Sequence, residues 1–186
     1  MKHTGTVELH TNRITLRKMC IDDATMIFKN FASDSEVASF LPWNRHNSIE
    51  DTYQMINKYN KYRNNKDYYL WGLVEQKSNE LFGYVRVISI DEQYSTIEVE
   101  YCTGKSFWNH HYTTESLHAV LDYLFNVVGV NVVTAKHPID NAHSGRVMRR
   151  CGFKHVKDIF ITKGDKEIMY RYYELEKSDF RDLDLN

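Results

Sequence analysis

The sequence predicts an α/β fold in which a mixed sheet of about six to seven strands carries helices on both faces. Two observations lead to this fold class. Strand-like and helical segments follow one another in the order β-α-α-β-β-β-α-β-α-β-β. A strand–helix–strand crossing in the middle of an otherwise antiparallel series requires one parallel pair of strands. No linker-like stretch interrupts the chain, so we expect one domain over residues 1–186.

The first third of the chain gives the opening strand and two helices. Residues 7–16 alternate as in a strand or an edge hairpin. A helix is expected from Asp22-Asp23-Ala24, because apolar residues recur after it at helical spacing. Ser48 followed three residues later by Asp51 predicts the capped start of a second helix.

The middle of the chain predicts three strands and then the clearest helix. The strands are rich in Tyr, Val, Ile and Trp and cover residues 68–75, 81–90 and 95–102. The helix is expected over residues 113–127, with Gly129 ending it in a left-handed cap. After it we expect a strand at 130–136, a helix at 142–150 that stops at Gly152, and a hairpin of residues 153–161 and 166–175.

Composition narrows the class of protein. Hydrophobic residues make up 42% and charged residues 26%, which is typical of a globular domain, and the net charge of −1 gives no basic surplus for nucleic acid. Arg146, Arg149 and Arg150 are interpreted as a charged helix face. Polar residues interrupt every apolar run, and the three cysteines lack a Cys-x-x-Cys pair. We therefore expect a cytoplasmic protein without a membrane or nucleic-acid partner.

Four local strings carry a family resemblance, which covers roughly Glu8 to Leu175. They are Thr-Asn-Arg-Ile-Thr-Leu-Arg at 11–17, Asp-Asp-Ala at 22–24, Ile-Glu-Val-Glu-Tyr-Cys at 97–102, and Asn-x-x-Ser…Gly-Phe between 141 and 153. In this order and spacing they resemble the GNAT N-acetyltransferases, in particular the RimJ/RimL-like branch. The resemblance implies transfer of acetyl from acetyl-CoA to a primary amine by direct attack in a ternary complex, without a metal.

The expected cofactor site follows from the resemblance and from backbone chemistry. Two strands that splay apart leave unpaired amides and carbonyls for the pantetheine arm, and a helix N-terminus favours the pyrophosphate. The amides of residues 101–103 are candidates for polarising the thioester carbonyl. The expected cofactor residues are Tyr101, Cys102, Thr103, Trp108, Asn109, His110, His111, Tyr112, Thr113, Thr114, Asn141 and Ser144.

The pyrophosphate loop departs from the family pattern. Where the family reads Trp-Gly-x-Gly-Tyr-Ala-Thr-Glu, this chain reads Trp-Asn-His-His-Tyr-Thr-Thr-Glu over residues 108–115. Asn109 and His111 thus replace glycines, which permit close approach and positive φ. Three interpretations remain open: His110 and His111 bind the phosphates, or the loop is reshaped and acetyl-CoA binding is weak or lost, or the loop tolerates the change.

Two side chains are candidates for proton transfer. The resemblance favours Glu98 as the base that deprotonates the amine, with Glu100 as second choice. Alternatively, both are strand residues that face solvent or pair with arginine. Met148 stands where many members of the superfamily have a tyrosine that acts as general acid. The candidate general acid in this chain is therefore Ser144. Alternatively, Ser144 caps a helix turn. Asn141 is a polar contact to the pantetheine arm, the N-cap of the short helix, or both.

Covalent and metal chemistry are disfavoured by the sequence. Cys102 lacks an identifiable histidine partner for a ping-pong route. His111, Glu115 and His118 share a helix face but match no ligand signature.

The amine acceptor is expected near the early helices, with Trp43, Tyr69, Trp71 and Glu100 as its contacts. It is a small-molecule amine or the amine of a peptide or protein. The alternative function is a non-catalytic GNAT-like module with weak CoA binding or a protein-binding role. The protein is expected to be a monomer or a homodimer.

Overall fold

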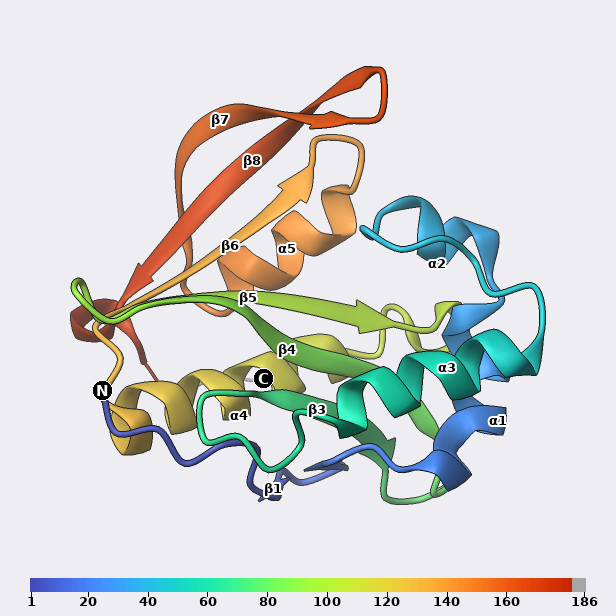
Figure 1. Cartoon of the computed structure of the whole chain (residues 1–186). Coiled ribbons are helices and arrows are strands. Elements are labelled where there is room, and N and C mark those ends of the chain that lie inside the picture. Colours follow the sequence, from blue (N-terminus) through green and yellow to red (C-terminus); the bar gives the residue numbers. More distant parts are fainter. Residues whose placement is uncertain (182–186) are drawn as a thin grey trace.

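A computed structural model describes residues 1–181 and shows one mixed sheet with the strand order β1-β2-β3-β4-β5-β6-β8-β7 (Figure 1). The strands are β1 Leu9–His10, β2 Ile14–Arg17, β3 Leu70–Glu75, β4 Leu81–Asp91, β5 Thr96–Thr103, β6 Val132–Pro138, β7 Lys154–Lys163 and β8 Lys166–Glu176. Among the strands of residues 1–181, only β5 and β6 run parallel, as the strand–helix–strand crossing predicts. The sheet has eight strands because residues 7–16 form a hairpin rather than a single strand.

The helices lie where periodicity predicted them, with two differences near the N-terminus. They are α1 Ala24–Ile27, α2 Ser35–Ser39, α3 Ile49–Asn60, α4 Tyr112–Tyr123 and α5 Ala142–Arg150. The first helix is broken: a 3-10 turn precedes α1, and the π-helical turn Phe28–Ala32 follows it. The short helix α2 was not expected, and Asp34 caps it by accepting hydrogen bonds from two backbone N–H groups of its first turn.

The ends of the longer helices follow the predicted caps. The carboxylate of Asp51 accepts the backbone N–H of Ser48 at 3.1 Å, so α3 starts as expected. α4 continues through the π-helical turn Leu124–Val128, and Gly129 ends it with φ +82°. Gly152 follows α5 with φ +92°.

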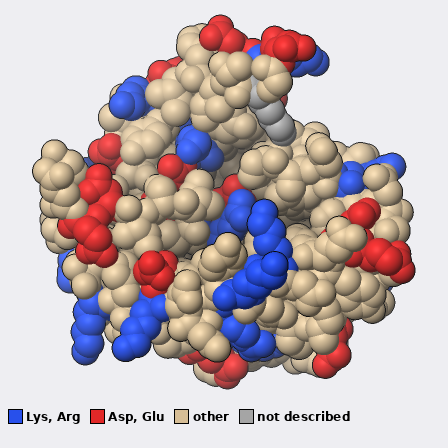
Figure 2. All heavy atoms as spheres, viewed as in Figure 1, with Lys and Arg blue, Asp and Glu red and all other residues tan. Residues whose placement is uncertain are grey.

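Two apolar cores lie on opposite faces of the sheet. One core packs α4 and α5 against the sheet through Leu117, Leu121 and Met148. The other packs the early helices against the opposite face through Ile27, Val37 and Ile56. Figure 2 views the molecule from the side of α3, where Lys and Arg side chains gather over the C-terminal end of that helix and the neighbouring strands. None of the described helices is long and apolar enough to cross a membrane.

Candidate active site

β5 and β6 start side by side and then diverge (Figure 1). They pair only where Thr96–Glu98 meets Val132–Thr134. A β-bulge in β4 between Val87 and Ser89 lies opposite the point of departure, and a bulge bends a strand and increases its twist. Among the described residues, the β6-facing edge of β5 beyond Glu98 has no partner strand. That edge is therefore open to an extended ligand.

Three adjoining cavities follow this divergence and are called here the cavity row. The first, of about 280 Å³, reaches Glu98 and Glu100 and is called the reaction pocket. The second, of about 80 Å³, shares with the first the residues Phe40, Leu41, Tyr101, Asn141 and Ser144. The third, also of about 80 Å³, lies at the amino end of α4 and shares with the second Trp108, Thr113, His143 and Val147. The row thus joins a pocket with two carboxylates to a helix N-terminus.

Most of the expected cofactor residues line the cavity row: Tyr101, Cys102, Thr103, Trp108, Asn109, His111, Thr113, Thr114, Asn141 and Ser144. The side chains of His110 and Tyr112 do not. Their rings stack on one another at 5.7 Å, and the Tyr112 ring packs near Phe82, 5.4 Å away. The Tyr112 hydroxyl donates to Glu75, so this side chain turns toward the sheet and away from the cavities.

The loop before α4 keeps a backbone conformation typical of glycine. Asn109 and His111 both have φ +64°, in the left-handed region. Asn and His enter this region more readily than most residues other than glycine, at a cost on the order of 1 kcal/mol or more. The altered residues thus adopt the positive φ for which glycine is favoured, and His111 directly precedes the first turn of α4.

Two arginines of α5 face the altered loop. Arg150 donates a hydrogen bond to Nδ1 of His111 at 2.5 Å, and Arg146 donates to Nδ1 of His143 at 2.6 Å. The His143 ring in turn stacks on Trp108 at 5.9 Å. Sequence analysis assigned these arginines only to a charged helix face, although their i, i+4 spacing already placed both on one side of α5. The third cavity therefore carries two cations in addition to the helix N-terminus.

Hydrogen bonds fix the walls between the cavities. Nε1 of Trp108 donates to the carbonyl of Thr103 at 2.7 Å, and the hydroxyls of Thr103 and Thr113 lie 2.8 Å apart. The Tyr101 hydroxyl donates to the carbonyl of Ser144 at 2.9 Å, which joins β5 to α5. The side chain of Asn141 accepts the backbone N–H of Ser144 at 3.1 Å, so Asn141 is the N-cap of α5.

The two carboxylates of the reaction pocket have different partners. Glu98 forms an ion pair with Lys136 of β6. Glu100 receives two hydrogen bonds on one oxygen, from the Tyr84 hydroxyl at 2.8 Å and from Nε of Arg86 at 2.9 Å. Both carboxylates remain partly exposed, with 16% of each side chain accessible. Successive odd positions of β5 face α4, so these even positions share the opposite face.

Comparison with known proteins shows the family. Residues 13–154, more than half of the chain, match the family model described as an acetyltransferase (GNAT) domain. The chain is a GNAT acetyltransferase. One curated relative is the uncharacterized N-acetyltransferase YoaA of Bacillus subtilis (strain 168), 27% identical over 78% of this chain and 82% of that protein. Another is the uncharacterized N-acetyltransferase p20 of Bacillus licheniformis, 26% identical over 94% of this chain and 92% of that protein.

Solved structures share the fold of this GNAT enzyme. A GNAT-family acetyltransferase from Bacillus anthracis has a TM-score of 0.82 with 22% identity, covering 92% of this chain and 99% of its own. The ribosomal-protein-S5-alanine acetyltransferase of Vibrio fischeri has a TM-score of 0.80 with 14% identity, covering 95% and 100%. The predicted fold class and the resemblance to the GNAT N-acetyltransferases are thereby confirmed. The protein is an acetyl-CoA-dependent N-acetyltransferase.

The remaining thiol and histidine candidates of this acetyltransferase are occupied by packing. Burial raises the pKa of the Cys102 thiol well above its usual value, and the side chain is 4% exposed. Glu115 is buried and accepts two hydrogen bonds from Arg13, at 3.1 Å from its backbone and 2.7 Å from its side chain. His118 lies against the carbonyl of Arg181 at 2.9 Å. His111, Glu115 and His118, which the sequence already disfavoured as a metal site, thus each have a separate hydrogen-bond partner.

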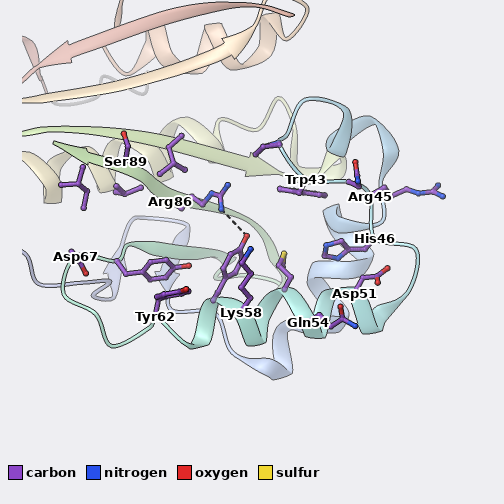
Figure 3. Close-up of a pocket in the computed structure, with 18 of the residues that line it drawn as sticks. Trp43, Arg45, His46, Asp51, Gln54, Lys58, Tyr62, Asp67, Arg86 and Ser89 are labelled. Carbon is purple, nitrogen blue, oxygen red and sulfur yellow. Dashed lines mark hydrogen bonds between the residues drawn. The ribbon is translucent and has the colours of Figure 1, made fainter. Parts of the chain in front are cut away.

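The expected acceptor contacts divide between two faces of the sheet. Trp43 lines a large groove beside α3 (Figure 3), and Glu100 lines the reaction pocket. Tyr69 and Trp71 line neither: they are 1% and 0% exposed and pack in the core on the α4 face. The expectation for these two is corrected because strand alternation directs them away from the groove, which Tyr68 reaches instead.

Proposed function

We propose that this acetyltransferase transfers acetyl from acetyl-CoA to a primary amine by direct attack while both substrates are bound. The observation that carries the proposal is the cavity row, because it leads from the amino end of α4 to a pocket with two carboxylates. Acetyl-CoA supplies the activated acetyl group as a thioester. The buried, protonated Cys102 thiol supports direct attack over a covalent acetyl-cysteine route.

The residues of the row fit acetyl-CoA. The open edge of β5 at residues 101–103 offers amides to the pantetheine arm. The first turn of α4 favours the pyrophosphate through its free N–H groups and its dipole. Arg146 and Arg150 add charge-assisted donors beside His111, which offsets the lost glycines. A microcin self-immunity acetyltransferase with a TM-score of 0.79 and 18% identity, covering 89% of this chain and 93% of its own, was solved with acetyl-CoA and AMP.

Glu98 is the proposed base. An α-amine with a pKa near 8 is roughly a tenth deprotonated at pH 7, so attack needs a proton acceptor. Glu98 lies in the reaction pocket, where its carboxylate pairs with Lys136 of β6. Glu100 is the weaker candidate because Tyr84 and Arg86 already donate to it, which suits a role in holding the acceptor site together.

Ser144 is the proposed proton donor to the departing CoA sulfur, and solvent water returns a proton to the serine oxygen, so that the products are the amide and the CoA thiol. Its side chain lies in the wall shared by the first two cavities, while its backbone N–H is held by Asn141 and its carbonyl by Tyr101. The residue one turn later, Met148, is buried and carries no proton. The serine hydroxyl therefore takes no part in these two hydrogen bonds, which use only the backbone N–H and carbonyl of Ser144.

Acetyl transfer is tested by incubating the protein with acetyl-CoA and a panel of acceptors that contains free α-amine peptides, polyamines and amino sugars. We expect acetylated product by mass spectrometry with one acceptor class and release of free CoA in equal amount. A Ser144→Ala variant should lose at least about tenfold in kcat with little change in KM. Binding of acetyl-CoA without transfer to any amine of the panel would contradict the proposal.

A further inference from the structure

A groove of about 1090 Å³ adjoins the reaction pocket on the α3 side of the sheet (Figure 3). It lies between the segment 42–47, helix α3 and the second half of β4, and it shares Pro42, Arg86 and Ile88 with the reaction pocket. The reaction pocket alone has room for one amine-bearing residue or a small amine. The adjoining groove therefore has room for the chain that carries the amine.

Positive charge dominates the centre of this groove. Lys58 rises from α3 toward Arg86 of β4 (Figure 3), and no described residue pairs with its ammonium group. Glu100 is the partner of Arg86. The carboxylates in the lining lie toward the ends: Asp51 already accepts two backbone N–H groups at the start of α3, and Asp67 lies at the far end. An occupant with negative charge at the centre is therefore favoured.

The wall opposite α3 is a free strand edge. β3 pairs with β4 only as far as Arg86. One further hydrogen bond follows, from the backbone N–H of Val87 to the carbonyl of Tyr69. From Ile88 to Asp91, β4 pairs with β5 alone among the described residues. Ile88 is 41% exposed there. An unpaired edge accepts an extended peptide as an added strand, which suits a peptide better than a compact small molecule.

We propose that this groove binds an extended acidic segment of a peptide or protein acceptor, which adds to the free edge of β4 and brings its amine to the reaction pocket. The inference rests on the proposed acetyl transfer, because the bound segment is there to bring its amine to the reaction pocket. Side chains of an added strand alternate, so every second residue faces α3 and Lys58. The segment meets the exposed ring of Tyr62 and the ring of Tyr68, which lie 5.6 Å apart.

The test uses a synthetic octapeptide with Glu at alternate positions and an acetylated N-terminus, so that its binding does not depend on transfer. Matched probes carry Gln in place of Glu, or N-methyl groups on alternate backbone amides. Binding is measured by calorimetry with the natural protein and with Lys58→Glu. Lys77→Glu is the control, because Lys77 is an exposed lysine of the β3–β4 turn that lines none of the cavities.

We expect the Glu peptide to bind more tightly than either matched probe and to weaken as salt rises. Lys58→Glu should weaken binding about three- to tenfold and Lys77→Glu less than twofold. Equal affinity of the Glu and Gln peptides, or no effect of Lys58→Glu, would overturn the inference. If small amines are acetylated while the Glu peptide does not bind, only the groove assignment fails. If the peptide binds but its unblocked form receives no acetyl group, the groove stands and the proposed transfer to this acceptor fails.

Discussion

The two ends of the cavity row present different kinds of groups to a ligand. At the amino end of α4 the main groups are backbone N–H donors, held in place by left-handed residues at Asn109 and His111. In the reaction pocket they are the side chains of Glu98, Glu100 and Ser144. A backbone site keeps its geometry when one residue with tolerable φ replaces another. A site made of side chains loses its chemistry when a side chain changes. Met148 is an example, because it stands where the family resemblance expects a tyrosine that can donate a proton.

Replacement of the base gives the largest expected effect at the side-chain end. Glu98→Gln should lower kcat/KM by about 10²–10⁴-fold while leaving acetyl-CoA affinity nearly unchanged. Lys136→Gln breaks the same ion pair but keeps the carboxylate, so it should lose less than about tenfold. Initial rates of acetyl transfer check both variants. Equal losses in the two would show that the ion pair, not the base, matters.

Removal of the α5 cations gives the next largest effect, at the backbone end. The double variant with Arg146→Gln and Arg150→Gln should weaken acetyl-CoA binding by roughly ten- to hundredfold, because charge-assisted contacts to phosphate are lost. Arg149→Gln is the matched control, since Arg149 instead donates to the Tyr173 hydroxyl at 3.2 Å. Calorimetric titration measures each affinity. Unchanged affinity in the double variant would leave the N-terminus of α4 as the main phosphate site.

Backbone strain at His111 gives a smaller effect, on stability. His111→Val places a β-branched side chain at φ +64° and should lower the free energy of unfolding by about 1–2 kcal/mol relative to His111→Gly. Urea denaturation of the two variants at equal pH measures the difference. Equal stability would mean that this position does not hold the left-handed conformation in solution.

The smallest expected effect concerns the packing of α5 on β6, because α5 lines both ends of the cavity row. His137 of β6 is buried and lies so close to Gly145 that a Cβ on Gly145 would be 2.7 Å from Nε2 of the imidazole. Burial lowers the pKa of His137 below its ordinary value of 6.5, with Arg171 and Arg149 adding to the shift. Folding thus favours the neutral ring, so its stabilisation is present above pH 6.5 and is lost as pH falls through the lowered pKa.

The free energy of unfolding should therefore decline below pH 6.5, with His137 contributing a slope of at most about 1.4 kcal/mol per pH unit. His137→Gln should make the dependence shallower in the same range. Denaturation at pH 5, 6 and 7 provides the comparison. Parallel curves for the natural protein and the variant would assign the decline to other groups, such as His46, whose pKa burial also lowers.

Sequence reasoning found the elements whose signals are local. The C-terminal hairpin, the capped helix α3, the long helix α4, the strand β5 and the helix α5 all follow from periodicity, caps and short motifs. The broken start of α1 and the short helix α2 escaped because a π-helical turn and a five-residue helix give too little periodicity to detect.

The parts that sequence missed depend on contacts between distant segments. Arg150 meets His111 only because α5 packs beside the amino end of α4, and nothing in either segment specifies that meeting. Tyr69 and Trp71 were assigned to the acceptor by their aromatic character, whereas their positions in β3 decide which face they occupy. The bulge in β4 that coincides with the divergence of β5 and β6 also lacks a sequence signal.

The most direct test of the account is a calorimetric titration of the natural protein with acetyl-CoA, beside His111→Gly. The account predicts saturable binding of one acetyl-CoA per chain, with affinities of the two proteins within about threefold, because the left-handed backbone is already in place without glycine. No binding by the natural protein, with binding restored in His111→Gly, would contradict it.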